Sequence, residues 1–186
     1  MFPIVLDLEI VPVALVGSGP LAVKRLTQFI QAGARRLTVF SESDDTALAA
    51  LAGERLIRRL PTDEDLAAFQ VIYIVDIEPG AAAGMAARCR ALGRLVNVED
   101  VKPLCDFHTP SQVRRGDLLL SISTGGRSPG LAQRLRRYLE DLFQPDWEDH
   151  LDELSRARDG WRAEGADMET VVRRTVEMIE ERGWLR

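Results

Sequence analysis

Cysteine and histidine are scarce in this sequence, with two of each among 186 residues. Cys89 and Cys105 form no C-x-x-C pair, and no secretory leader opens the chain, so we expect reduced thiols in a cytoplasmic protein. No apolar run approaches the roughly 18 to 20 uninterrupted residues that cross a bilayer. We therefore expect neither a disulfide framework nor a membrane anchor.

An excess of positive charge is also missing. The net charge is −5, and residues 144–186 alone hold 12 acidic against 7 basic residues, which leaves 17 of each sign before them. Surfaces that follow phosphates need a local excess of Lys and Arg, so nucleic acid is not an expected partner. One small basic cluster remains, made of Arg114, Arg115, Arg127, Arg134, Arg136 and Arg137.

Hydrophobic residues are plentiful, at 46%, and their pattern indicates a folded α/β protein. Short apolar runs alternate with helical patterns over the first hundred residues, which is typical of βαβ units and a parallel sheet. The predicted strands are residues 11–16, 37–40, 56–60, 71–75 and 95–98. The predicted helices between them are residues 21–32, 46–52 and 81–92.

The alternation of strand and helix patterns stops after Asp100, which suggests a second module. Two strand-like pieces, residues 107–110 and 118–123, are separated by an Arg-Arg-Gly-Asp turn. Three helices are then predicted, the first opened by Pro129 and the others at residues 147–163 and 167–182. We predict three parts: a first domain at 1–112, a region at 113–143 and a helical region at 144–186.

A glycine motif follows the first predicted strand. Gly17-Ser18-Gly19-Pro20-Leu21-Ala22 fits G-x-G-x-x-A and opens a helix, the position that a dinucleotide site requires. Gly17 permits the tight turn, Gly19 lets backbone N–H groups approach a pyrophosphate, and Ala22 allows close helix packing. The alternative is an ordinary glycine-rich βα turn. At the end of the next strand, Glu42 favours NAD over NADP, with a solvated loop glutamate as the alternative.

Two further motifs lie later in the chain. Asp100 follows a strand at the carboxyl edge of the sheet, where it is either a general base or a loop or helix-capping residue. The turn at residues 123–129 can hold an anion, and it can equally be an N-cap by Ser128. Cys105 and His108 lack a second ligand pair, so a buried thiol and a hydrogen-bonded imidazole are favoured over a metal site.

Five segments carry a resemblance to a known family: residues 2–8 (FPIVLDL), the turn at 17–25, residues 96–100 (VNVED), residues 104–107 (LCDF) with Pro110, and residues 121–129 (SISTGGRSP). The sequence resembles the precorrin-2 dehydrogenase and sirohydrochlorin ferrochelatase family, which is also met as the N-terminal module of siroheme synthase. The resemblance implies a Rossmann-like parallel-sheet domain, followed by a dimerisation region and a C-terminal helical region.

The resemblance also implies a function. Members are homodimers that use NAD to oxidise precorrin-2, an anionic tetrapyrrole, to sirohydrochlorin, and some insert ferrous iron as a second substrate. The family's key aspartate, which transfers protons, falls on Asp100. No methyltransferase domain follows, so a separate methyltransferase is expected upstream in the pathway. The rival interpretations are a chelatase without dehydrogenase activity and a non-catalytic dinucleotide-sensing scaffold.

The predicted site residues form two groups. The cofactor group is Gly17, Ser18, Gly19, Pro20, Leu21, Ser41, Glu42 and Asp76. The substrate group is Arg114, Arg115, Ser123, Thr124, Gly125, Gly126, Arg127 and Ser128. The chain departs from the family pattern at two places, where Ser18 replaces the middle of three glycines and where Val75-Asp76-Ile77 replaces small or polar residues. No resident metal is predicted.

Overall fold

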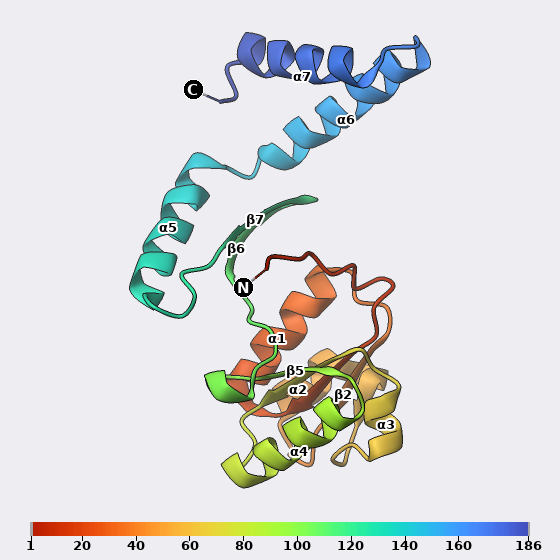
Figure 1. The fold of residues 1–186 in the computed structure, drawn as a ribbon, viewed down its shortest axis with the longest axis vertical. Helices are drawn as coiled ribbons and strands as arrows, with labels where there is room; N and C mark the ends of the chain where they lie inside the picture. The colour runs from red at the N-terminus through yellow and green to blue at the C-terminus, as the bar shows by residue number, and fades with distance from the viewer. Residues whose placement is uncertain (1, 186) are drawn as a thin grey trace. The chain divides into compact units, whose positions relative to one another are not determined.

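The computed structural model describes residues 2–185 and divides into two compact units, the first ending at Thr109 and the second beginning at Pro110 (Figure 1). Each unit has its own strands and helices. The sequence-based boundaries at residues 112 and 143 stay predictions.

The first unit is built on a parallel sheet with the strand order β3-β2-β1-β4-β5. Its strands are β1 (Val13–Gly17), β2 (Leu37–Phe40), β3 (Leu56–Ile57), β4 (Val71–Val75) and β5 (Leu95–Val98). All five residues of β1 and of β4 are buried, as expected when helices cover both faces of a parallel sheet. The predicted α/β class is confirmed, with an edge strand shorter than predicted.

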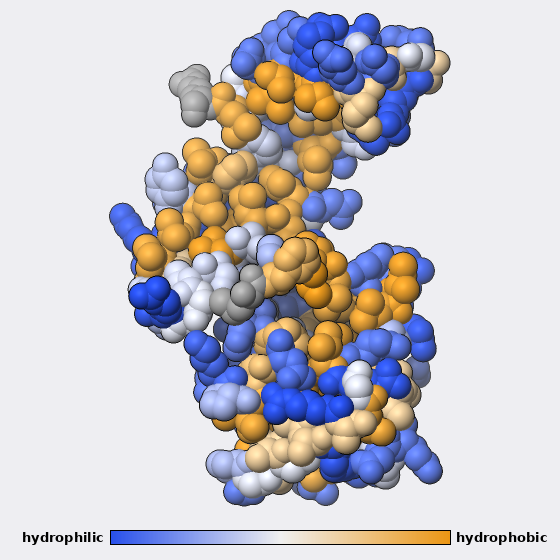
Figure 2. All heavy atoms as spheres, in the orientation of Figure 1, coloured by the Kyte–Doolittle hydropathy of each residue, from blue (hydrophilic) through white to orange (hydrophobic). Residues whose placement is uncertain are grey.

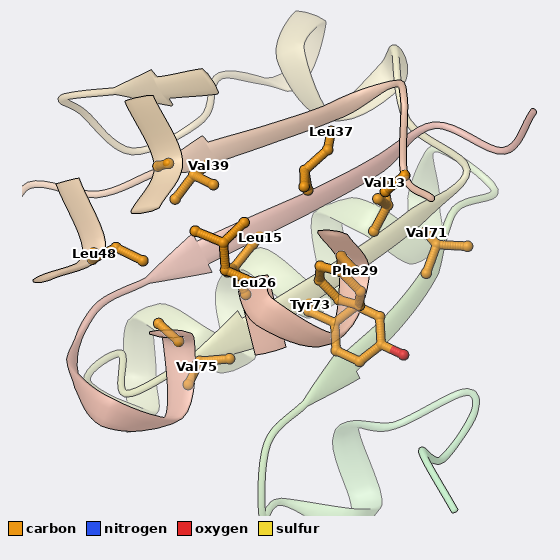
Figure 3. Close-up of a cluster of buried hydrophobic side chains, with 13 residues drawn as sticks. Val13, Leu15, Leu26, Phe29, Leu37, Val39, Leu48, Val71, Tyr73 and Val75 are labelled. Atoms are coloured by element: carbon orange, nitrogen blue, oxygen red, sulfur yellow. The ribbon is translucent and has the colours of Figure 1, made fainter. Parts of the chain in front are cut away.

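Helices cover the two faces of this sheet. They are α1 (Gly19–Gln31), α2 (Thr46–Ala52), α3 (Asp63–Ala67) and α4 (Pro79–Ala91), with 3₁₀ turns η1 (Gly53–Arg55) and η2 (Lys102–Leu104). Leu26 and Phe29 of α1 and Leu48 of α2 pack against Leu15 and Tyr73 on one face (Figure 3). The opposite face packs on Leu66, Met85, Ala86 and Cys89 from the α3 and α4 segments. Since alternate residues of β1 point to opposite faces, one strand supplies both cores.

The chain order places a crevice at the middle of the sheet. The chain leaves β1 for β2 on one side, and later crosses to β4 on the other side of β1. In open α/β sheets, ligands bind outside the carboxyl ends of the strands at such a switch point. The carboxyl ends of β1 and β4 therefore mark the first place to look for a site.

The second unit contains an antiparallel hairpin and three helices. They are β6 (Ser111–Arg115), β7 (Leu118–Ile122), α5 (Pro129–Leu142), α6 (Trp147–Ala163) and α7 (Met168–Arg182). Its core is small: the buried apolar side chains in the described part of this unit are Val113, Trp147 and Val171. The Trp147 ring lies 5.0 Å from that of Phe143, measured between centroids.

Much apolar surface in this unit is left exposed. On α5, apolar side chains 38 to 62% exposed recur at helical spacing, and Figure 2 shows apolar residues gathered over this segment. We call this set the α5 stripe: Leu131, Leu135, Tyr138 and Leu142. From residue 2 to residue 185, no helix combines the length and the hydropathy needed to cross a membrane.

Three elements differ from the sequence-based expectation. Residues 107–110 form no strand, because the Phe107 ring packs at 5.1 Å from Tyr73 and its carbonyl accepts a 2.8 Å bond from Asn97 Nδ2. The first hairpin strand is instead β6. Helix α3 was not predicted, since its five residues are specified by a capping box between Thr62 and Asp65 rather than by apolar periodicity.

Candidate active site at the carboxyl edge of the sheet

A glycine turn joins β1 to α1 at the switch point. Gly17 has φ +133°, and a Cβ atom there would lie 1.7 Å from the carbonyl oxygen of Val75. Gly19 has φ +80° and opens α1 after Ser18, whose backbone is extended. The first N–H groups of a helix have no partner within it; Gly19 N donates to a carboxylate of a later loop, and Gly17 and Gly19 add no side chain of their own over the turn. The turn therefore fits a dinucleotide pyrophosphate.

A cavity of about 180 Å³ lies beside this turn. Its polar lining comes from Asp76 after β4 and from Glu99 and Asp100 after β5. The remaining lining is apolar: Leu21, Ile74, Ile77, Pro79, Ala82, Val98, Val101 and Leu104. Of the predicted site residues, the structure thus brings Leu21, Asp76 and Asp100 together. A larger hollow of about 440 Å³ lies beside the start of β2, away from the carboxyl edge.

Two aspartates at this cavity have an unusual backbone. Asp76 has φ +50° and Asp100 has φ +61°, and within residues 2–185 these are the non-glycine residues with positive φ. Asp tolerates this left-handed region better than most residues, yet the conformation still costs free energy and is concentrated at functional sites. Both carboxylates are therefore held where β4 and β5 end.

The Asp100 carboxylate is exposed and makes no hydrogen bond or ion pair with any residue from 2 to 185. Its neighbours hold the backbone, since Glu99 N donates to Ile74 O at 2.9 Å and Val101 N donates to Val98 O at 3.0 Å. The helix-capping alternative for Asp100 is wrong, because η2 is capped at Val101 without a side-chain bond. A fixed, unbonded carboxylate on a cavity is suited to accept a proton.

An ion pair that the sequence did not reveal braces this aspartate. Arg25 Nε and one terminal nitrogen donate to the two Glu99 oxygens at 2.8 and 2.6 Å, and the side chains are only 11% and 13% exposed. The Arg25 guanidinium also lies 5.8 Å from the centre of the Tyr73 ring. Since Glu99 directly precedes Asp100, the pair ties α1 to the backbone that carries the candidate base.

We expect Glu99→Gln to lower the free energy of unfolding by about 3 kcal/mol, because it leaves the nearly buried Arg25 charge without its counterion. Urea unfolding measures the change. The matched control is Glu9→Gln, which removes an exposed pair with Arg35 of similar length, 2.7 Å, and should cost less than about 1 kcal/mol. Equal losses in the two variants would refute a bracing role for Glu99.

The loop after β2 holds the other predicted cofactor residues. Ser41 is buried and its hydroxyl accepts a 3.3 Å bond from Ser43 N. Glu42 is exposed and contacts no other side chain in the described part through a hydrogen bond or ion pair. A different carboxylate approaches the glycine turn: Asp45 Oδ2 accepts a 3.0 Å hydrogen bond from Gly19 N. Sequence reasoning missed Asp45, because its polar loop has no periodicity and the contact spans 26 residues.

The second glycine-rich turn lies in the second unit. Gly125 and Gly126 have φ +63° and +75°. Ser128 Oγ accepts a bond from Leu131 N at 3.3 Å, so its role as the N-cap of α5 is confirmed. The Thr124 hydroxyl donates to Ser128 O at 3.1 Å and accepts from Ser128 N at 3.3 Å, which closes the turn. Anion binding by this turn stays a prediction.

The arginines of the substrate group differ in availability. Arg115 donates to the carbonyls of Phe143 (2.7 Å), Glu140 and Arg114, which ties β6 to the end of α5. Arg114 donates to Gly116 O at 3.4 Å. The Arg127 side chain is exposed on the turn before α5. Arg115 therefore connects β6 to α5 through backbone carbonyls, while substrate binding by all three arginines stays a prediction.

The Cys105 thiol is part of the loop that follows Asp100. It donates to Val98 O at 3.1 Å and to Val101 O at 3.4 Å, and burial raises its pKa. The expected hydrogen-bonded imidazole is wrong, because His108 is exposed and makes no hydrogen bond with the described residues. Cys105 itself is half-buried rather than buried as predicted, and it supports the loop as a hydrogen-bond donor.

A parallel sheet whose first strand ends in a glycine turn at the switch point defines a dinucleotide-binding protein of the Rossmann class. The model of the family described as "Putative NAD(P)-binding" matches residues 4–111, and the chain belongs to this family. The model of the sirohaem biosynthesis protein central domain matches residues 115–142. NAD(P) is thus the cofactor class of the first unit.

Curated relatives match about three quarters of the chain. The chain is 36% identical over 141 residues to a siroheme synthase of Methylococcus capsulatus, covering 74% of this chain and 30% of that protein. It is 37% identical over 145 residues to siroheme synthase 1 of Pectobacterium atrosepticum, covering 76% of this chain and 30% of that protein. The chain therefore spans about 30% of the length of these relatives.

A solved structure shares the fold of the whole chain. SirC, precorrin-2 dehydrogenase, superposes with a TM-score of 0.80 at 24% identity, over 100% of this chain and 92% of that chain. The predicted succession of parallel-sheet domain and helical C-terminal region is thereby confirmed.

Proposed function

We propose that this protein oxidises precorrin-2 to sirohydrochlorin with NAD as the hydride acceptor. One observation carries the proposal: the glycine turn and the unbonded Asp100 carboxylate lie at the same carboxyl edge, and Leu21 in the first turn of α1 lines one cavity with Asp100. The printed names of the relatives and of the structural neighbour, siroheme synthase and precorrin-2 dehydrogenase, supply the substrate class.

The chemistry needs few groups from the protein. Oxidation removes a hydride and a proton from the tetrapyrrole, and NAD supplies the acceptor for the hydride. The start of α1 would hold the dinucleotide through backbone N–H groups, and Gly17 and Gly19 keep side chains out of its path. Asp100 receives the proton, and the Arg25–Glu99 pair keeps its backbone in place.

The deciding experiment follows NADH absorbance after precorrin-2 and NAD are added, with sirohydrochlorin and ferrous iron as a second arm. NADH formation supports the dehydrogenase. Iron insertion without any NADH formation would instead establish the chelatase alternative. Dinucleotide binding without either reaction would establish the non-catalytic scaffold and overturn the proposal.

We also propose a homodimer formed through the second unit. The α5 stripe is exposed, and a unit with so few buried apolar side chains gains stability if a partner covers it. A two-fold interface, in which the same surface is used on both subunits, covers it in both copies. The match of residues 115–142 to the sirohaem biosynthesis central domain spans this stripe.

Light scattering should give about twice the chain mass of 20.7 kDa at micromolar concentration. Tyr138→Glu, which puts a charge into the stripe at its most exposed side chain (62%), should weaken the dimer at least tenfold, or about 1.4 kcal/mol. Gln133→Glu adds the same charge on another face of α5 and should leave the mass unchanged. A monomeric wild-type protein would disprove the dimer.

A further inference from the structure

In Rossmann-type sites, a carboxylate near the end of β2 usually accepts hydrogen bonds from the hydroxyls of the adenosine ribose. The sequence offers Glu42 for this task, but in the structure Glu42 is exposed and the carboxylate that hydrogen-bonds to the glycine turn belongs to Asp45. Asp45 Oδ2 lies 3.0 Å from Gly19 N, and Oδ1 accepts from Ala47 N and Leu48 N, both at 3.0 Å.

These three bonds fix the Asp45 side chain. Oδ1 is fixed by the first turn of α2 and Oδ2 by the start of α1, so the carboxylate bridges the two helices that follow β1 and β2. Backbone donors stabilise the charged form and lower its pKa, with the bond from Leu48 as the largest cause. An ionised carboxylate only accepts hydrogen bonds, and its oxygens retain lone pairs beyond those used here.

We propose that Asp45 is the residue that selects NAD over NADP, by accepting hydrogen bonds from the adenosine ribose hydroxyls and repelling a 2′-phosphate. The assignment rests on the proposed NAD-dependent function. Asp45 thus takes the role that the sequence indicated for Glu42. The Glu42 carboxylate makes no hydrogen bond to the described residues, whereas an Asp45 oxygen lies 3.0 Å from Gly19 N in the turn proposed to bind the pyrophosphate.

The charges around Asp45 also favour NAD over NADP. Its loop, residues 41–45, carries Glu42, Asp44 and Asp45 and no basic residue. Arg58 contacts this loop through Asp44, with 3.5 Å between the two side chains. A 2′-phosphate at this place would meet like charge without a paired cation, whereas a neutral hydroxyl would meet an acceptor.

A competing interpretation makes the opposite prediction. If Asp45 merely fills the anion position at Gly19 N, the pyrophosphate must displace it, and removing its charge would tighten NAD and NADP binding equally. The two interpretations are therefore separated by one substitution. Asp45→Asn keeps a good N-cap for α2 and nearly the same shape, so the fold should survive.

Calorimetric titration of the full chain with NAD and with NADP is the test. Asp45→Asn should bind NAD about tenfold more weakly and should lower the preference for NAD over NADP at least tenfold. Glu64→Gln removes one carboxylate charge from an exposed side chain of α3, outside this loop, and should change neither affinity by more than about threefold. An unchanged preference in Asp45→Asn, or equal tightening of both ligands, would overturn the assignment.

A second ligand tests the wild-type protein directly. An NAD analogue that lacks the 2′-hydroxyl of the adenosine ribose should bind the wild type about tenfold more weakly than NAD, and Asp45→Asn should no longer distinguish the two. Equal binding of NAD and the analogue by the wild type overturns the Asp45 assignment and leaves the dehydrogenase proposal standing. If the wild type binds neither NAD nor NADP, both proposals fail.

Discussion

Asp100→Asn is expected to lower the turnover of precorrin-2 by roughly 10²- to 10⁴-fold, the usual contribution of a positioned general base. Asn keeps the size of the side chain and tolerates the left-handed backbone at φ +61°, but its amide cannot take up the proton. NAD affinity should stay within about threefold, because the cofactor is held by the glycine turn. Steady-state kinetics and calorimetry measure the two effects.

A second substitution separates chemistry from packing at the same position. Asp100→Gly should raise the free energy of unfolding slightly or leave it unchanged, because glycine adopts positive φ without strain. The same variant should lose turnover as severely as Asp100→Asn. Near-normal turnover in either variant would mean that another group takes the proton, and Asp100 would then be a structural residue of the loop after β5.

The sheet and its glycine turn could be predicted from the sequence because their signals are local. Buried parallel strands are continuous apolar runs, as in β1 and β4, and the turn needs Gly17 for reasons that the local pattern already contains. The end of β5 also follows from its apolar run, so the predicted position of Asp100 at the carboxyl edge of the sheet is confirmed. These features depend on neighbours a few residues away.

The missed features depend on contacts between distant residues. Arg25 and Glu99 are 74 residues apart and meet only once α1 lies against the sheet. Phe107 has the character of a strand residue, but tertiary packing against Tyr73 holds it in a loop. Asp45 reads as one polar residue among several until its oxygen is seen at Gly19 N. Sequence patterns do not encode such pairings, so the sequence indicates Glu42 rather than Asp45 as the ribose-binding carboxylate.

Gly17→Ala is expected to lower the free energy of unfolding by about 4 kcal/mol, enough to unfold a marginally stable domain. Two causes add. An L-residue is strained at φ +133°, and the new Cβ atom would lie 1.7 Å from Val75 O, so β1 and β4 must separate where they pair. The close approach that builds the dinucleotide turn is also what makes the turn intolerant of one methyl group.

The matched control is the same substitution at Gly84, in the interior of α4. No atom outside its own helix lies within 4 Å of a Cβ atom built there, so Gly84→Ala should raise the free energy of unfolding by about 0.5 to 1 kcal/mol through helix propensity. Urea unfolding compares the two variants, with insolubility of Gly17→Ala counted as loss of stability. If Gly17→Ala stays within about 1 kcal/mol of the wild type and still binds NAD, then β1 and β4 do not meet as closely as the structure shows. The pyrophosphate would in that case have to be bound by a turn of different shape.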